Sequence, residues 1–178
     1  MAPVVSIVTT EELSGADLAA IRALMAAAFD DFSDDDWAHA LGGWHALIRA
    51  DGQVVAHGSV VERRIRVGDT DVRAGYVEAV GVAPDRQRTG LGTAVMAALG
   101  DVIRREFELG VLSSGEWSFY ERLGWERWQG QTFVREADGT LVRTPDDDDG
   151  VMVLRCGPEP AIDLAAPISC DRRPGDPW

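Results

Sequence analysis

One stretch constrains the fold of this chain more than any other, VEAVGVAPDRQRTGLGTAVM from Val77 to Met96. A β-branched run that contains a single acid, Glu78, leads into Pro84 and a basic turn, and an amphipathic helix follows at once. This order predicts a strand, a turn and a helix whose first backbone N–H groups are available to an anion. The stretch therefore indicates an α/β fold with a phosphate-binding turn.

The two glycines of the turn, Gly90 and Gly92, stand where the backbone has to approach an anion closely and a Cβ would be in the way. Arg86 and Arg88 add positive charge beside these amides. A turn that uses glycine only for steric relief is the simpler alternative, and a lone Gly-x-Gly would favour it. The spacing Gln-x-x-Gly-x-Gly, after a VxxVxVxP segment and before a helix, favours a coenzyme A site instead.

In this context the segment resembles the acyl-CoA signature of the GNAT superfamily of N-acetyltransferases. The resemblance implies a single GNAT-like domain over residues 1–178, with a central, mixed, mostly antiparallel sheet flanked by helices. It also implies acetyl-CoA as the acetyl donor, with strand backbone groups on the pantetheine arm and turn amides on the pyrophosphate. The cofactor-binding residues expected on this basis are Val80, Gly81, Val82, Gln87, Arg88, Thr89, Gly90, Leu91, Gly92 and Thr93.

Composition narrows the partners of the chain. With 178 residues, 46% of them hydrophobic, it is long enough to bury one sizeable core. No membrane span or signal peptide is evident, so we expect a cytoplasmic protein without a membrane partner. Two cysteines and no Cys/His cluster with zinc spacing predict no disulfide framework and no metal site. A net charge of −13 argues against nucleic acid and favours a cationic ligand.

Periodicity predicts an alternation of strands and helices around one mixed sheet. The strands expected cover residues 4–9, 44–48, 54–67, 72–82, 109–113 and 151–154, with further strands inside 125–142 and a hairpin turn at Asp138-Gly139. The helices expected begin after Ser14, at Ser33, after Gly90 and at Glu116. Residues 155–178 are predicted to form an irregular, proline-containing tail that closes the acceptor site.

Most of the acids have a sufficient structural explanation when each group is taken alone. The run Asp34 to Asp36 lies in the first turn of a predicted helix, where a carboxylate stabilises the helix dipole by about 0.3–1 kcal/mol. The run Asp146 to Asp149 reads as a solvated loop. Glu78 differs, because it lies inside an apolar strand beside the proposed thioester, where desolvation would raise its pKa towards that of a useful base.

Tyr120 is the candidate acid. It lies in a FYxxxGW pattern on a predicted helix that follows the strand ending at Ser113, so its hydroxyl can point towards the sulfur of coenzyme A. A core tyrosine with a hydrogen-bonded hydroxyl is the alternative. The three histidines have no metal-binding spacing, and His39 and His57 are expected to be hydrogen-bonded structural residues.

Four separated segments resemble the aminoglycoside 2′-N-acetyltransferases: residues 31–45, 75–78, 144–150 and 170–178. The resemblance implies an antibiotic pocket lined by acids, with a polar contact from the end of a strand, and a homodimer. The substrate-binding residues expected are Asp31, Asp36, Glu78, Ser113, Asp148, Asp176 and the terminal carboxylate of Trp178. The compact segment from Ser113 to Tyr120, and Trp44 where the family usually has methionine, bear on the antibiotic spectrum more than on the chemistry.

The implied reaction is direct acetyl transfer to the 2′-amine. Glu78 would take the proton of the amine, through water, and Tyr120 would protonate the departing thiolate, while the N–H of Val80 polarises the thioester carbonyl. One alternative keeps the fold and changes the acceptor to another cationic amine metabolite. Another is a non-catalytic module that binds coenzyme A or sequesters a drug, and the presence of Glu78 and Tyr120 argues against it.

Overall fold

The computed structural model describes residues 3–158 and 160–178, which form two compact units. Unit 1 contains the chain up to residue 61 together with residues 77–102, and unit 2 contains residues 62–76 and 103–178. Strands β3 (Gln53–Val67) and β4 (Thr70–Val82) each contribute residues to both units. The expectation of one domain over the whole chain stays a prediction.

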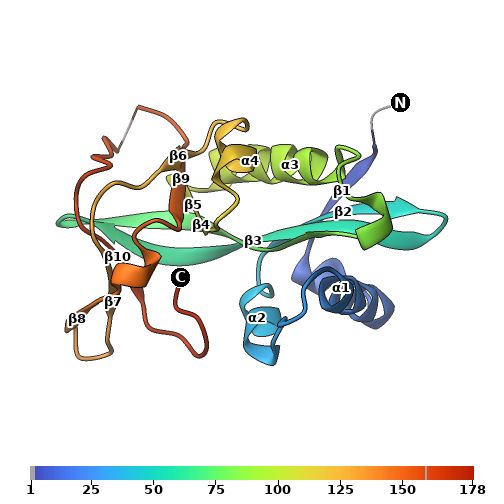
Figure 1. Cartoon of the computed structure of the whole chain (residues 1–178), viewed down its shortest axis with the longest axis horizontal. Helices are drawn as coiled ribbons and strands as arrows, with labels where there is room; N and C mark the ends of the chain where they lie inside the picture. Colours follow the sequence, from blue (N-terminus) through green and yellow to red (C-terminus); the bar gives the residue numbers. More distant parts are fainter. Residues whose placement is uncertain (1–2, 159) are drawn as a thin grey trace. The chain divides into compact units, whose positions relative to one another are not determined.

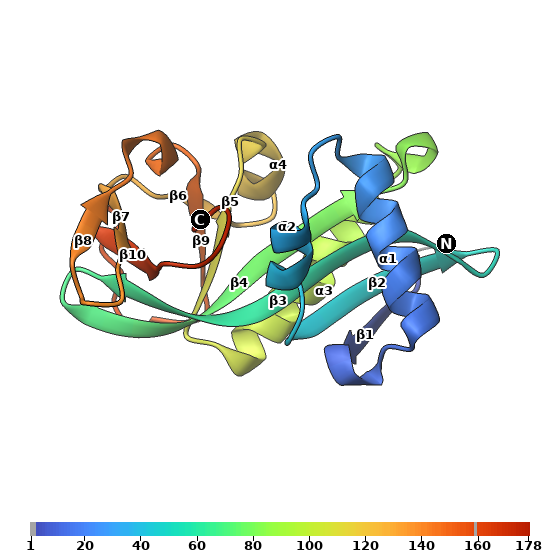
Figure 2. The same ribbon diagram turned by 90° about the horizontal axis from the view of Figure 1, so that it is seen from below.

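Unit 1 has helices on both faces of its strands. Its strands β1 (Val5–Thr9) and β2 (Trp44–Ala50) run antiparallel, and β2 runs antiparallel to β3. Helices α1 (Gly15–Ala28) and α2 (Asp34–His39) lie on one face of these strands and α3 (Leu91–Glu106) lies on the other (Figure 1 and Figure 2). Within residues 3–158 and 160–178, no helix is both long enough and apolar enough to span a membrane.

Capping boxes start both helices on the first of these faces, at the two serines where the sequence predicts that helices begin. The Ser14 hydroxyl accepts from the N–H of Asp17, whose carboxylate accepts in return from the N–H of Ser14. Ser33 and Asp36 make the same reciprocal pair at α2. Such caps satisfy amides that the helix leaves without a partner, and each contributes about 1 kcal/mol.

The core of unit 1 packs both helix layers directly onto the strands. Ile21, Leu24 and Met25 of α1 form one buried cluster with Leu47 and Val54. On the other face, a Cβ at Gly58 would stand 2.9 Å from side-chain carbons of Leu99 and Val95, so the absence of a side chain there lets α3 approach β3 closely. Strand and helix are therefore held at short range beside the end of β4.

Unit 2 is built from strands with one short helix, α4 (Trp117–Glu121). In it β5 runs parallel to β4 and antiparallel to β9, β9 runs antiparallel to β6, and β7 runs antiparallel to β8. These pairings confirm the mixed, mostly antiparallel sheet. The strands are β5 (Leu109–Ser113), β6 (Glu126–Arg127), β7 (Thr132–Arg135), β8 (Leu141–Arg143), β9 (Val151–Arg155) and β10 (Ile168–Asp171).

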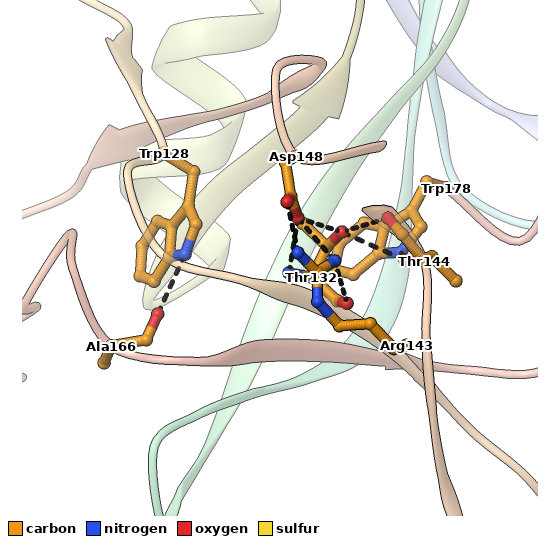
Figure 3. Close-up of polar contacts among 7 residues, drawn as sticks. All are labelled: Trp128, Thr132, Arg143, Thr144, Asp148, Ala166 and Trp178. Atoms are coloured by element: carbon orange, nitrogen blue, oxygen red, sulfur yellow. Dashed lines mark hydrogen bonds and ion pairs between the residues drawn. The ribbon is translucent and has the colours of Figure 1, made fainter. Parts of the chain in front are cut away.

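The C-terminal segment, which was expected to be irregular, contains strand β10, which the sequence did not predict. Strand β10 pairs with β3 in antiparallel and with β7 in parallel orientation. The indole N–H of Trp128 also donates to the carbonyl of Ala166 at 3.0 Å (Figure 3). A four-residue strand whose partners are distant in the sequence leaves too short a local pattern to be recognised.

A substitution at Gly43 tests how closely the backbone at Gly43 approaches the backbone at Val60 in unit 1. A Cβ at this position would overlap the carbonyl oxygen of Val60, which is backbone and cannot rotate away. We expect Gly43→Ala to lower the free energy of unfolding by about 1–3 kcal/mol, the usual cost of overpacking. Urea unfolding followed by circular dichroism measures it.

Gly15→Ala is the matched control, because a Cβ at Gly15 has no protein atom within 4 Å. Its free energy of unfolding should stay within about 1 kcal/mol of the parent. Equal stability of the Gly43 and Gly15 variants would contradict the packing described here.

Candidate functional site

The turn after β4 has the features of an anion-binding site. A 3-10 turn, Pro84–Arg86, follows β4, and α3 starts at Leu91. The N–H of Ala94 donates to the carbonyl of Gly90 at 3.0 Å, which is the first hydrogen bond of the helix. The N–H groups of the helix residues before Ala94 come before this bond and can bind an anion. Glycine at 90 is explained by its φ of +89°, since a Cβ there would meet no protein atom within 4 Å.

Charge and backbone conformation reinforce this reading of the turn. Arg88 also has a left-handed backbone, with φ +60°, and residues 87–90 are exposed. Successive amides in turns of this kind form concave anion sites, and the guanidinium groups of Arg86 and Arg88 raise the local potential. These residues fit a pyrophosphate, which is the part of coenzyme A that they are predicted to hold.

The backbone of β4 is irregular at the predicted base. Glu78 is half-buried, and its carbonyl accepts from the Ser59 hydroxyl at 3.2 Å. The next residue, Ala79, is not glycine but has a φ of +49°. Its carbonyl accepts from Nδ1 of His57 at 2.8 Å. Two consecutive carbonyls of β4 thus bind side chains of β3, at a position where the chain adopts a strained conformation.

His57 is hydrogen-bonded to a second buried histidine, His45. Nδ1 of His45 lies 2.9 Å from Nε2 of His57, and Nε2 of His45 lies 2.8 Å from the hydroxyl of Thr10. Burial lowers the pKa of His45 to about 4, an effect that Glu11 partly opposes. Burial also lowers the pKa of His57 to about 3, against the bond to Ala79. Both rings are therefore neutral near pH 7, and the hydrogen bonding expected for His57 is confirmed.

The two acids predicted from the first half of the chain have different surroundings. Asp36 is half-buried and its Oδ2 accepts from the N–H and the hydroxyl of Ser33, both at 2.8 Å. Asp31 is exposed. Asp36 therefore caps α2, and any second role would use the lone pairs that the cap leaves open.

Tyr120 is buried in unit 2, with 8% of its surface exposed. It lies on α4, with its ring edge-on to Phe119 and to Trp125. Desolvation raises the pKa of Tyr120 to about 12, although a hydrogen bond with Ser114 acts in the opposite direction. Its hydroxyl therefore keeps its proton near pH 7, as a proton donor must.

Asp148 is held in place by hydrogen bonds and an ion pair (Figure 3). Its Oδ1 accepts from the N–H and the hydroxyl of Thr132, both at 2.9 Å, and from Nη1 of Arg143 at 2.7 Å. A second contact joins its Oδ2 to Nη2 of Arg143. The bond from Arg143 is the main reason that the pKa of Asp148 is lowered. Asp148 thus fixes the acidic segment 145–149 to β7 and β8.

The C-terminus is anchored to the same part of unit 2. Trp178 is only 4% exposed, and its indole N–H donates to the Thr144 hydroxyl at 3.2 Å. Thr144 in turn donates to Thr132 at 3.0 Å, so the terminus and Asp148 share one network (Figure 3). The N–H of Trp178 donates to Asp176 at 3.0 Å. The predicted ligands Asp148, Asp176 and Trp178 are therefore brought together.

Ser113 lies at the edge of this group. It ends β5 opposite Val151, and its Oγ would lie 2.9 Å from a Cβ at Gly150. The half-buried Asp147 belongs to the same region and was missed by sequence reasoning. Desolvation raises the pKa of Asp147, and the neighbouring charge of Asp176 acts in the same direction. No sequence signal separates Asp147 from the other acids of its run.

Comparison with known proteins gives the family. The model of the acetyltransferase (GNAT) domain matches residues 9–128. An aminoglycoside 2′-N-acetyltransferase of Mycolicibacterium fortuitum is 45% identical, over 97% of this chain and 90% of that protein. The chain belongs to the aminoglycoside 2′-N-acetyltransferase family of GNAT acetyltransferases. It is an enzyme, and acetyl-CoA is its acetyl donor.

Solved GNAT structures agree with this family in their fold. YhbS of Escherichia coli, solved in complex with CoA, gives a TM-score of 0.68 at 18% identity, covering 96% of this chain and 91% of that one. A GNAT acetyltransferase of Brucella melitensis, in complex with acetyl-CoA, gives 0.61 at 20% identity, covering 90% and 94%. Identities at this level support the shared fold.

The buried histidines predict how stability depends on pH. The unfolded chain binds a proton on each histidine near pH 6.5, whereas the folded protein does so only near pH 4 at His45 and pH 3 at His57. In this window the unfolded state binds more protons, so the free energy of unfolding falls as the pH is lowered. Urea titrations between about pH 7 and about pH 4 measure the slope.

The double variant His45→Asn, His57→Asn is the control, because asparagine does not titrate. Its slope between about pH 6.5 and about pH 4 should be shallower than that of the parent. Identical slopes would show that the two histidines are not neutral in the folded protein.

Proposed function

We propose that this chain transfers the acetyl group of acetyl-CoA to the 2′-amine of aminoglycosides. The match to the Mycolicibacterium fortuitum protein carries the proposal, because it covers 97% of the chain. The GNAT model ends at residue 128, so it does not include Asp148, Asp176 and Trp178. The longer match extends the likeness to this C-terminal region, where the acceptor ligands are proposed.

A polycationic acceptor suits the charges of the described residues. An aminoglycoside carries several ammonium groups and little apolar surface, so its recognition must be electrostatic and hydrogen-bonded. One ion pair at about 4 Å contributes about 4 kcal/mol at an effective dielectric constant of 20, before desolvation. The proposed ligands remain Asp31, Asp36, Glu78, Ser113, Asp148, Asp176 and the terminal carboxylate of Trp178.

Asp147 and Asp148 are assigned different parts in this proposal. The charge of Asp148 is balanced by Arg143, so its main effect is to hold segment 145–149 in shape. Asp147 is half-buried near Asp176, and burial disfavours its charge. A bound ammonium would relieve that cost, because an opposite charge favours the ionised carboxylate. We therefore add Asp147 to the proposed acceptor ligands.

The donor is proposed to bind at β4 and the start of α3. Backbone groups of Val80, Gly81 and Val82 would bind the pantetheine arm, and the amides from Gln87 to Thr93 would bind the pyrophosphate. Gly81 is buried against α1, since a Cβ there would lie 2.6 Å from Cε of Met25. This packing supports a fixed backbone at the proposed thioester position.

The chemistry proposed is direct transfer. Glu78, through a water molecule, takes a proton from the acceptor ammonium, and the neutral amine then attacks the thioester carbon. The N–H of Val80 donates to the carbonyl oxygen as negative charge develops there. The carbon–sulfur bond breaks, and Tyr120 gives its proton to the thiolate. The nitrogen loses its second proton as the amide forms, and that proton restores the hydroxyl of Tyr120. The raised pKa of Tyr120 is consistent with a hydroxyl that is protonated before this step.

We further propose a homodimer and a cytoplasmic location, as the family resemblance suggests. Light scattering coupled to size-exclusion chromatography measures the dimer directly. A monomer at micromolar concentration would remove this part of the proposal without affecting the reaction.

The direct test is to incubate the protein with acetyl-CoA and tobramycin. Coenzyme A release and a product acetylated on the 2′-amine, located by NMR, are the expected results. Acetylation of other cationic amines, but not of tobramycin, would mean that the acceptor is another cationic amine and not an aminoglycoside. Stoichiometric tobramycin binding with no coenzyme A release would favour a non-catalytic binding module.

Glu78→Gln tests the proposed base. Because glutamine cannot take a proton, kcat should fall by about 100-fold or more, while the Kd for acetyl-CoA changes little. Stopped-flow rates and calorimetric titration measure the two quantities. An unchanged kcat near pH 7 would remove Glu78 from this role.

Asp147→Asn and Asp148→Asn form a matched pair one residue apart. Loss of a substrate-facing charge at 147 should raise the KM for tobramycin by about 10-fold with little loss of stability. Loss of charge at 148 removes the ion pair with Arg143 and should lower the free energy of unfolding by about 1–3 kcal/mol. Steady-state kinetics and urea unfolding separate the two effects, and equal KM values in both variants would contradict the assignment.

A further inference from the structure

Four groups of unit 1 form one hydrogen-bonded chain that ends at the irregular part of β4. The hydroxyl of Thr10, the rings of His45 and His57, and the carbonyl of Ala79 follow one another at 2.8, 2.9 and 2.8 Å. The last contact lies on the residue next to Glu78. The chain thus connects the 3-10 turn after β1 to the backbone beside the proposed base.

The direction of every hydrogen bond in this chain follows from its last member, the carbonyl of Ala79. The carbonyl of Ala79 can only accept, so Nδ1 of His57 carries its proton and, in a neutral ring, Nε2 is an acceptor. His45 must then donate from Nδ1, which leaves its own Nε2 to accept from the Thr10 hydroxyl. A proton on Nε2 of His57 would face the N–H of His45, donor against donor.

The other end of the chain is fixed as well. The oxygen of Thr10 accepts from the N–H of Gly42 at 2.9 Å and from that of Gly43 at 3.2 Å. These two bonds use its lone pairs and leave the hydroxyl proton for His45. The competing acceptor, the carbonyl of Gly43, is more distant at 3.4 Å.

Burial makes this arrangement specific. Both rings are fully buried, and they lie on adjacent strands because His45 pairs with Ser59 and Leu47 pairs with His57. A hydrophobic side chain would fill this core position without the need for partners. Two imidazoles instead need hydrogen-bond partners in fixed directions inside the protein. The last of these hydrogen bonds is made to Ala79, whose φ is +49°.

We propose that His45 and His57 are positioning residues for acetyl transfer, which hold the Ala79 peptide so that Glu78 and the N–H of Val80 keep their reactive orientation. This inference rests on the proposed function. The rings touch neither acceptor nor donor, and they take and give no proton during the reaction. Their effect is geometric, since small displacements of reacting groups cost large factors in rate.

His57→Leu and His57→Asn form the test. Leucine removes the donor to Ala79, whereas the amide N–H of asparagine can occupy the position of Nδ1 and restore that bond. We expect kcat of the leucine variant to fall by about 10- to 100-fold, with the KM for tobramycin and the Kd for acetyl-CoA within about threefold of the parent. The asparagine variant should recover most of the lost kcat.

Val102→Ala controls for loss of stability, because Val102 is a buried residue of α3 with 1% exposure and is outside the chain of bonds. It should unfold at lower urea concentration and keep its kcat. A leucine variant with parental kcat, or equal losses in the leucine and asparagine variants, would overturn the proposal. Failure of the parent itself to acetylate would instead refute the proposed function.

Thr10→Val gives a second measurement if His57→Leu does not fold. The substitution removes the hydroxyl of the half-buried Thr10, which is the first donor of the hydrogen-bonded chain, so Nε2 of His45 loses its hydrogen-bond donor. A lower kcat with unchanged acetyl-CoA affinity supports the chain of bonds. Parental kcat in this variant contradicts it.

Discussion

The strained peptide at Ala79 is the constraint on which the proposed donor-binding part of this protein depends. A left-handed conformation costs a non-glycine residue about 1–2 kcal/mol, so other interactions must hold it. Here the hydrogen bonds from Ser59 and His57 act on two consecutive carbonyls, and Ala79 also packs against the α1 core cluster. The irregular conformation of β4 at Ala79 is thus imposed by its neighbours. It lies between Glu78 and Val80, to which we assign different tasks in the reaction.

Unit 2 uses charge in two ways. Asp148 is neutralised by Arg143 and shares the Thr132–Thr144 network with the indole of Trp178, which fixes the acidic segment and the C-terminus to one another. The charges of Asp147 and Asp176 repel each other, and burial adds to the cost of ionising Asp147, although a hydrogen bond with Thr144 opposes it. A protein that binds a polycation needs both kinds of acid: one kind shapes the site, and the other provides its negative potential.

The sequence predicted those features whose causes are local. The order of strand, turn and helix from Val77 to Met96 and the helix starts at Ser14 and Ser33 involve neighbours in the chain, and the structure confirms them. Strand β10, the ion pair of Asp148 and the bond between His45 and His57 depend on which strands become adjacent. One acid in a run of four cannot be distinguished from its neighbours before Thr132 and Arg143 are brought beside it. The roles of the site residues follow from resemblance and remain proposals.

The tautomers of the two histidines show most directly whether a neutral hydrogen-bonded chain holds β4 beside Glu78. Long-range ¹H–¹⁵N spectra of histidine-labelled protein near pH 7 distinguish a protonated from an unprotonated ring nitrogen. We expect a proton on Nδ1 and none on Nε2, in both His45 and His57. An imidazolium signal from either ring, or a proton on Nε2 of His57, would contradict it.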